Sequence, residues 1–190
     1  TMPGNPASTI VGTGSSYTVQ ASDRANGLTV TVTGSKLGYV TTVKTSAPTA
    51  PAAGPYATVG TPSFSANAGQ FVVGSVLTAN PGTRSPAPQY RYQWLRGGAP
   101  IVGATAQTYT PVGADYQNSI SVRVTPSLLG YLADPQDSSA TTIGAGTFAA
   151  TPTPSITGTM RVGSTLSISA PNWTPAAAFG YQWYADGTAI

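Results

Sequence analysis

The sequence predicts an all-β protein that is built from internal repeats. Apolar and hydroxyl-bearing residues alternate with a period of two in several short stretches, which is the pattern of strands with one buried face. Turn-forming residues separate these stretches, and Gly and Pro contribute 22 and 17 of the 190 residues. No stretch repeats its apolar residues with the 3.6-residue period of a capped helix, so we expect helix to be nearly absent.

The strands can be placed in order along the chain. Alternation of apolar and polar side chains covers residues 28–33 (LTVTVT), residues 120–125 (ISVRVT) and residues 166–169 (LSIS). Turn signals occur at residues 26–27 (NG), 80–82 (NPG), 96–98 (RGG) and 186–187 (DG). Short alternating stretches between such turns are typical of the strands of a β-sandwich.

Comparison of the chain with itself gives two long matches. At a shift of 92 residues, residues 17–39 match residues 109–131, and Asp23 falls on Asp115. At a shift of 89 residues, the triplets VGS at 73–75 and YQW at 92–94 match those at 162–164 and 181–183. One repeat is thus about 90 residues long, which is the size of a small β-sandwich.

The two matches divide the chain into three segments. Residues 57–142 form one complete repeat, residues 1–47 correspond to the C-terminal half of a repeat, and residues 149–190 correspond to the N-terminal half. The joints at residues 46–55 and 144–147 are short, uncharged and rich in Pro or Gly. We therefore expect semi-extended linkers between the segments.

The composition excludes most kinds of active site. The chain has no His, Cys or Glu, so a Ser-His-Asp triad, a Cys-His dyad, an ordinary zinc site and a disulfide are all impossible. An acid-base pair would have to come from five aspartates alone: Asp23, Asp115, Asp134, Asp137 and Asp186. Asp134 and Asp137 lie three residues apart, but Ca²⁺ requires more oxygen ligands than this pair provides. We expect no enzyme, no cofactor and no metal site.

The charges also bear on partners. The net charge is +3, with 8 Lys and Arg against 5 acids, and these charges are scattered singly. Nucleic-acid binding usually needs a clustered basic surface, so we expect no nucleic-acid partner. Arg84, Arg91 and Arg96 form the only local concentration, and we expect them to be solubilising strand and loop residues. No window of about 18 apolar residues occurs, so we expect no membrane span.

Several motifs of the complete repeat occur together in the order of a known domain. They are GSVLTA at residues 74–79, YQWLRGG at 92–98, Tyr109 with Asp115, and ISVRVT at 120–125. With these motifs the repeat resembles an immunoglobulin-like domain. More narrowly, it is similar to the bacterial Ig-like tandem repeats of large secreted and cell-surface proteins of high-GC Gram-positive bacteria. The resemblance implies that Trp94 and Trp183 occupy the core tryptophan position of the third strand, in a core without disulfides.

Aromatic residues are the candidate ligand contacts. Tyr90 and Tyr92 share one face of a strand with Trp94, and such a row either stacks on sugar rings or fills a core. Trp173 lies in the loop segment 171–175 (PNWTP), and its counterpart in the complete repeat is Arg84. Trp173 is therefore our candidate for an exposed aromatic residue, the alternative being that it caps the end of its own domain.

Two hypotheses for function follow. The first is a non-enzymatic extracellular structural repeat that forms a stalk or fibre. The alternative is a carbohydrate- or surface-binding adhesion module that uses Trp173, Tyr90 or Tyr92, with a surface glycan as its partner. Both predict a secreted or cell-surface protein.

The incomplete repeats lead to a further expectation about partners. Residues 149–190 of one copy can complete residues 10–45 of the next, head to tail, and such a contact propagates into a fibre. The alternative is that the chain limits are arbitrary limits within a long repeat protein, whose neighbouring repeats are then the partners.

Overall fold

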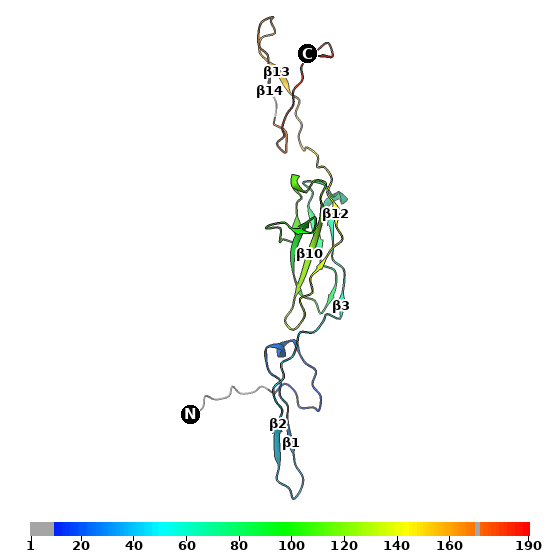
Figure 1. Ribbon diagram of the computed structural model, residues 1–190, viewed down its shortest axis with the longest axis vertical. Coiled ribbons are helices and arrows are strands. Elements are labelled where there is room, and N and C mark those ends of the chain that lie inside the picture. Colours follow the sequence, from blue (N-terminus) through cyan, green and yellow to red (C-terminus); the bar gives the residue numbers. More distant parts are fainter. Residues whose placement is uncertain (1–9, 170–171) are drawn as a thin grey trace, which may run out of the picture.

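The computed structural model describes residues 10–169 and 172–190, which form small antiparallel sheets in three successive regions of the chain (Figure 1). We call residues 10–47 the first unit, residues 57–142 the middle unit and residues 149–190 the last unit. Residues 1–9, at the start of the predicted half-repeat, and residues 170–171, within the last unit, lie outside the described residues. The prediction of a mostly β protein is confirmed, since the described elements are strands and three short 3-10 helices.

The described residues include no helix that is long and apolar enough to cross a membrane.

The first unit consists of a short helix followed by one hairpin. Its elements are η1 (Ala21–Ala25), β1 (Thr31–Gly34) and β2 (Thr42–Thr45). β1 and β2 pair in antiparallel fashion with Val32 opposite Lys44, and an isolated bridge between Leu28 and Thr49 extends the ladder. The side chains of β1 and β2 are all exposed, although the strands keep the alternation that predicts one buried face.

The middle unit contains most of the strands. Its elements are β3 (Thr58–Val59), β4 (Ser63–Ala66), η2 (Asn67–Gly69), β5 (Leu77–Asn80), β6 (Arg84–Ser85), β7 (Gln89–Arg96), β8 (Ala99–Pro100), β9 (Thr108–Tyr109), η3 (Gly113–Asp115), β10 (Ser119–Ser127), β11 (Gln136–Asp137) and β12 (Thr141–Thr142). The order of the larger sheet is β11-β10-β7-β8, with β12 also paired to β10. β4, β5 and β9 form a three-stranded sheet, and β3 pairs with β6.

The core of the middle unit draws side chains from both of its larger sheets. Leu77 and Ala79 of β5 pack in one buried cluster with Trp94 of β7 and Val122 of β10. Trp94 is completely buried, and its indole Nε1–H donates a hydrogen bond to the carbonyl of Ala106 at 3.0 Å. The ring therefore joins the two sheets without leaving a buried polar group unpaired.

The last unit contains two separate hairpins. Its strands are β13 (Ser155–Thr157), β14 (Ser167–Ser169), β15 (Tyr184–Ala185) and β16 (Thr188–Ala189). Asp186 and Gly187 form the turn between β15 and β16 with φ of 49° and 81°. Gly97 and Gly98 form the matching turn between β7 and β8 with φ of 53° and 82°. Two successive residues at positive φ give the tight turn that a two-residue hairpin needs.

The joint between the first and middle units is tied by backbone hydrogen bonds. The amide of Gly54 donates to the carbonyl of Gly130 at 2.8 Å, and the amide of Leu132 donates to the carbonyl of Gly54 at 2.9 Å. Gly130 also faces the first unit, because a Cβ atom placed on it would lie 2.7 Å from the Cα of Ala21. The composition of residues 46–55 did not predict these contacts.

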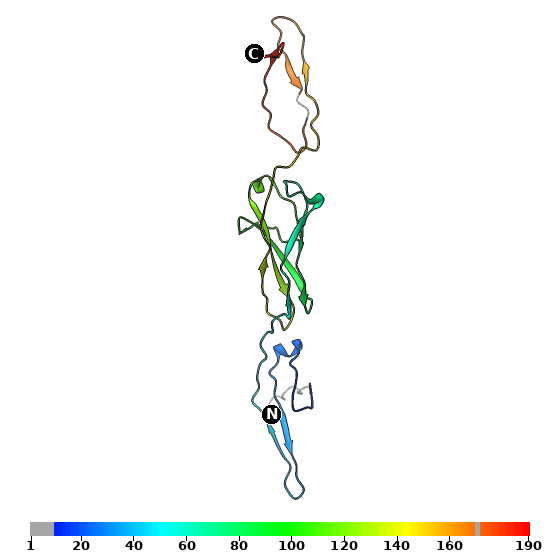
Figure 2. The same ribbon diagram turned by 90° about the vertical axis from the view of Figure 1, so that its right-hand side faces the viewer.

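The second joint is tied in a similar way. The amide of Gly144 donates to the carbonyl of Phe71 at 2.8 Å, and the amide of Val73 donates to the carbonyl of Gly144 at 3.1 Å. A Cβ atom on Gly146 would collide with the carbonyl oxygen of Val73, so the chain passes this loop too closely for a side chain. Side views from two directions show the three units following one another along the long axis (Figure 1 and Figure 2).

Candidate functional site

A buried carboxylate in the middle unit accepts three hydrogen bonds. Asp115 lies at the end of η3 and is completely buried. Its Oδ1 accepts a hydrogen bond from Nε of Arg96 at 2.6 Å, at the end of β7. Its Oδ2 accepts from the hydroxyl of Tyr109 at 2.6 Å and from the amide of Val112 at 2.7 Å. Arg96 is thus part of an ion pair, and the expectation that it only solubilises the surface is wrong.

The ionisation of this cluster follows from its contacts. Burial by itself would raise the pKa of Asp115, but hydrogen bonds from Arg96, Tyr109 and Val112 outweigh it and lower that pKa. Burial and the hydrogen bond to Asp115 raise the pKa of Tyr109 to about 12. The carboxylate therefore stays charged and the phenol stays protonated at neutral pH, which suits a structural link between β7, β9 and η3.

The first unit contains a matching pair that sequence reasoning did not recognise as a contact. The hydroxyl of Tyr17 donates to Oδ2 of Asp23 at 2.8 Å, and the amide of Gln20 donates to the same oxygen at 2.7 Å. The self-comparison contains the signal, because the Tyr and the Asp recur six residues apart in both copies.

Tyr90 and Tyr92 lie on β7 and are partly buried against the core cluster that contains Trp94. The hydroxyl of Tyr90 donates to the carbonyl of Gly82 at 3.4 Å. Burial, with a smaller contribution from Tyr90, raises the pKa of Tyr92. The inner faces of both rings are thus occupied by the protein's own core.

Trp173 is half-buried within the last unit. Its ring makes edge-on contacts with Phe148 and Phe179, with ring centroids 5.1 and 5.6 Å away. Its indole Nε1–H donates to the carbonyl of Pro152 at 3.3 Å. Trp183 is also half-buried, and its carbonyl accepts a hydrogen bond from the amide of Ile190 at 3.0 Å.

Arg84, the counterpart of Trp173 in the middle unit, is buried, so the expectation that it is a solubilising residue is wrong. Its guanidinium lies 5.4 Å from the centre of the Tyr56 ring, which itself stacks on Tyr131. Its Nη2 donates to the carbonyl of Asp134 at 3.2 Å, and its Nη1 lies 3.8 Å from the carboxylate of the same residue. The cation is thus held against the Tyr56 ring, beside the first joint.

The acids named as possible ligands for a cation are engaged elsewhere. Asp134 faces Arg84, whereas Asp137 accepts two hydrogen bonds from Arg123 at 2.7 and 2.8 Å. Within residues 10–169 and 172–190, no group of three or more His, Cys, Asp or Glu side chains is placed to hold a metal ion.

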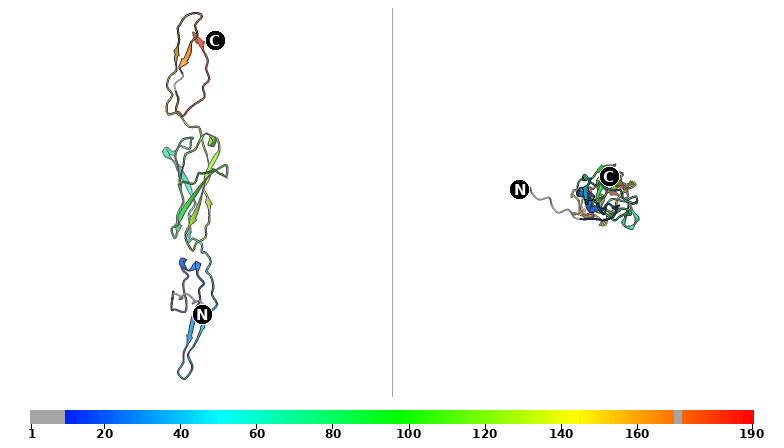
Figure 3. Two further views of the ribbon diagram at one scale, coloured as in Figure 1. Left: turned by 90° about the vertical axis from the view of Figure 1, so that its left-hand side faces the viewer. Right: turned by 90° about the horizontal axis from the view of Figure 1, so that it is seen from below.

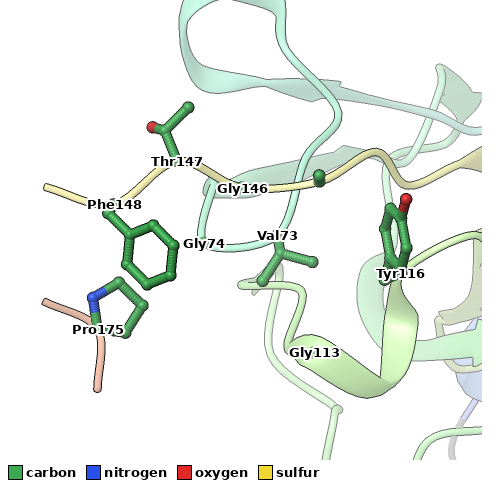
Figure 4. Close-up of a pocket in the computed structure, with 9 residues that line it drawn as sticks. Val73, Gly74, Gly113, Tyr116, Gly146, Thr147, Phe148 and Pro175 are labelled. Carbon is green, nitrogen blue, oxygen red and sulfur yellow. The ribbon is translucent and has the colours of Figure 1, made fainter. Parts of the chain in front are cut away.

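A cavity of about 390 Å³ lies at the joint between the middle and last units. Phe148 and Pro175 line it from one side, and Val73 and Tyr116 line it from the other (Figure 4). Its lining contains no charged residue, and the rings of Tyr116 and Phe148 are each nearly half exposed. The cavity can accept an apolar group or a flat ring, but it offers few side-chain hydrogen bonds.

Comparison with protein-family models, curated proteins and solved structures finds no match to this chain.

Proposed function

We propose that the chain is a non-enzymatic extracellular structural repeat in which immunoglobulin-like units stand end to end as a stalk or fibre. The joints carry this proposal, because backbone hydrogen bonds tie each linker to a loop of the middle unit. Viewed along the long axis, the units overlap within one narrow outline (Figure 3). Because the units follow one another in a line and hydrogen bonds hold the joints, the two ends of the chain stay far apart, as a spacer requires.

Matching hydrogen bonds in the first and middle units support a common repeat. In the middle unit, Oγ of Ser138 accepts from the amide of Val122 at 3.0 Å. In the first unit, Oγ of Ser46 accepts from the amide of Val30 at 3.1 Å. The shift of 92 residues relates both members of these pairs. At the same point of both ladders, a serine hydroxyl accepts the hydrogen bond that a backbone carbonyl would otherwise accept. This match favours the same fold for both units.

Strand pairing in the last unit supports the same conclusion. β4 pairs with β5 so that Phe64 lies opposite Ala79, and β13 pairs with β14 so that Ile156 lies opposite Ile168. The shift of 89 residues relates Ala79 to Ile168, and a shift of 92 relates Phe64 to Ile156. The two sheets that meet at Trp94 support the assignment of this repeat to a disulfide-free immunoglobulin-like sandwich.

The stiffness of the first joint can be tested at Gly130. Gly130→Ala places a methyl group against Ala21 across the joint, whereas Gly38→Ala has nothing within 4 Å of the new methyl group. Gly38→Ala is the matched control for backbone strain, since the φ values of Gly130 and Gly38 are 85° and 84°. Small-angle X-ray scattering should show a bent or broadened distribution of interatomic distances for Gly130→Ala only. Equal profiles for both variants, or a flexible wild-type chain, would contradict the spacer proposal.

The cavity at the second joint favours a second candidate function, a carbohydrate- or surface-binding adhesion module. The exposed rings of Tyr116 and Phe148 flank this cavity, and Trp173 supports Phe148 from within the last unit. A glycan array with the whole chain separates the two functions. Binding that is lost in both Tyr116→Ala and Trp173→Ala supports adhesion, and uniform silence supports the spacer.

A further inference from the structure

The chain contains a single Asp–Pro bond, and a buried arginine contacts its carbonyl. The bond joins Asp134 to Pro135 in the loop between β10 and β11, and both residues are exposed to solvent. Nη2 of Arg84 donates to the carbonyl oxygen of Asp134 at 3.2 Å, and Nη1 lies 3.8 Å from Oδ2 of the same residue. One guanidinium thus faces both the main-chain carbonyl and the side-chain carboxylate of Asp134, which places the two groups side by side.

The guanidinium of Arg84 has donors that the protein leaves unused. The side chain is only 1% exposed, and its Nε and Nη1 have no hydrogen-bond partner among the described residues. Buried donors are usually paired, since each unpaired one costs free energy. A negative charge that develops on the Asp134 carbonyl therefore meets a cation that is already buried beside it and incompletely paired.

Gln136 restrains the carboxylate of Asp134. Its Nε2 lies 3.1 Å from both carboxylate oxygens, and Gln136 is itself fixed as the first residue of β11, opposite Val124 of β10. The side chain of Asp134 remains 50% exposed, so water reaches it. A nucleophile that is held beside its target in this way reacts much faster than a free one.

We infer that the middle unit cleaves its own chain between Asp134 and Pro135. A carboxylate oxygen of Asp134 attacks the carbonyl carbon of the same residue, and the carbonyl oxygen becomes an oxyanion that accepts a hydrogen bond from Arg84. The oxyanion collapses, the bond from this carbon to the Pro135 nitrogen breaks, and the nitrogen takes a proton from solvent. The product at Asp134 is a cyclic anhydride, which one water molecule opens to two carboxyl groups. The net reaction is the hydrolysis of one peptide bond.

The other aspartates do not combine these features. The residue after Asp134 is the only proline that follows an aspartate. A proline nitrogen carries no hydrogen in the peptide and leaves as a secondary amine, which makes it a better leaving group once protonated. Asp115 is completely buried, and three hydrogen bonds hold its carboxylate in place. The combination of nucleophile, leaving group and adjacent cation therefore occurs at Asp134.

The two products of this cleavage stay together. β11 follows the bond directly and pairs with β10, and Arg123 donates two hydrogen bonds to Asp137 across this ladder. The loop that ends at Asp134 includes Gly130, whose carbonyl accepts from the amide of Gly54 at the first joint. Cleavage frees one end of this loop, so it loosens the joint while the core around Trp94 stays folded.

Incubation of the whole chain in mildly acidic buffer tests the inference, with denaturing electrophoresis and intact mass spectrometry as readouts. The folded chain should yield fragments 1–134 and 135–190 about tenfold faster than the same chain unfolded in urea, because unfolding removes the contact with Arg84. Equal rates would indicate the ordinary acid lability of an Asp–Pro bond and would overturn the inference. A folded chain that stays intact while the unfolded chain is cleaved would overturn it as well.

Variants of the loop test the nucleophile and the leaving group separately. Asp134→Asn removes the attacking carboxylate, and Pro135→Ala restores an ordinary peptide bond, so each should remove most of the cleavage. Asp137→Asn is the matched control, because it changes an exposed aspartate of the same segment and keeps the Asp134–Pro135 bond. Cleavage of Asp134→Asn at the wild-type rate, or an equal loss in Asp137→Asn, would contradict the role of Asp134.

The role of Arg84 is tested without relying on a variant of this buried residue alone. Arg84→Gln should slow cleavage to the rate of the unfolded chain, but the loss of a buried cation also destabilises the unit. Hydroxylamine added to the wild-type chain provides an independent readout, because it attacks an anhydride and should leave a hydroxamate on the fragment that ends at Asp134. A fragment 1–134 that carries only free carboxyl groups in the presence of hydroxylamine would contradict the anhydride step.

Discussion

β1 and β10 have nearly the same residue pattern, but opposite contacts with solvent. Just beyond the partner strand of each, a serine accepts from a valine amide: Ser46 from Val30, and Ser138 from Val122. Val122 is nevertheless buried among core side chains, whereas Val30 faces water. The comparison shows that local sequence determines the hairpin, whereas burial depends on strands that are distant in the sequence.

Asp23 of the first unit and Asp115 of the middle unit show the same difference between local and long-range contacts. Asp23 and Asp115 both accept from a tyrosine hydroxyl and a nearby amide. Only Asp115 also meets an arginine, because Arg96 comes from β7, a strand that the described first unit lacks. The turn is therefore a local structure, and the ion pair is a product of the complete unit.

Substitution of the two tryptophans should give the largest difference. Trp94→Ala removes a completely buried ring and should destabilise the middle unit by about 3–5 kcal/mol, comparable to the stability of a small domain. Trp183→Ala should change the middle unit by less than about 0.5 kcal/mol, since Trp183 lies in the last unit. Hydrogen exchange of the amides of β7 and β10 measures both. Unchanged protection in Trp94→Ala would contradict the core role.

The second difference concerns pH. Because the pKa of Asp115 is lowered on folding from its usual 3.8, its contribution to stability is present above that pH and is lost as pH falls through the folded value. Asp115→Asn should lower the free energy of unfolding by about 3 kcal/mol at pH 7 and should flatten its decline below about pH 4. Denaturant titrations at several pH values measure this. Asp23→Asn is the control, because Asp23 accepts from a tyrosine and an amide but from no arginine. An equal loss of stability in Asp23→Asn would contradict a contribution from Arg96.

The smallest expected difference lies at the paired serines. Ser138→Ala leaves the buried amide of Val122 without its acceptor and should cost about 1–2 kcal/mol. Ser46→Ala exposes the corresponding amide of Val30 to water and should cost less than about 0.5 kcal/mol. Thermal unfolding followed by circular dichroism compares them. A larger loss for Ser46→Ala would indicate that the first unit is covered in solution.

Much of the local structure could be predicted from the sequence. The period of two located β10 and β14, and the residue pairs Gly97–Gly98 and Asp186–Gly187 located the hairpin turns, because these signals depend only on neighbouring residues. The self-comparison also identified which positions correspond between units.

The contacts made over long distances could not be predicted in the same way. Arg84 and Arg96 were predicted to lie on the surface. The alternation along a strand does not reveal that an acidic residue distant in the sequence, Asp134 or Asp115, will face the arginine. Tyr90 and Tyr92 could have lined either a core or an open face. The pattern shows that they share a face of the strand, but it does not show whether another sheet packs on that face. The joints were predicted only as linkers. Their Gly and Pro content indicates a turn-rich, extended backbone, but it does not indicate which loop of the middle unit the linker contacts.

The tied joints also determine how such a rod would yield to tension. The two backbone hydrogen bonds between Gly54 and residues 130–132 are few beside the ladder of eight residue pairs that joins β7 to β10. A pull on the two ends therefore separates a joint before it opens a core. In such a rod each linker would release its slack while the middle unit stays folded, and extension at the joint would spare the core around Trp94 from mechanical unfolding.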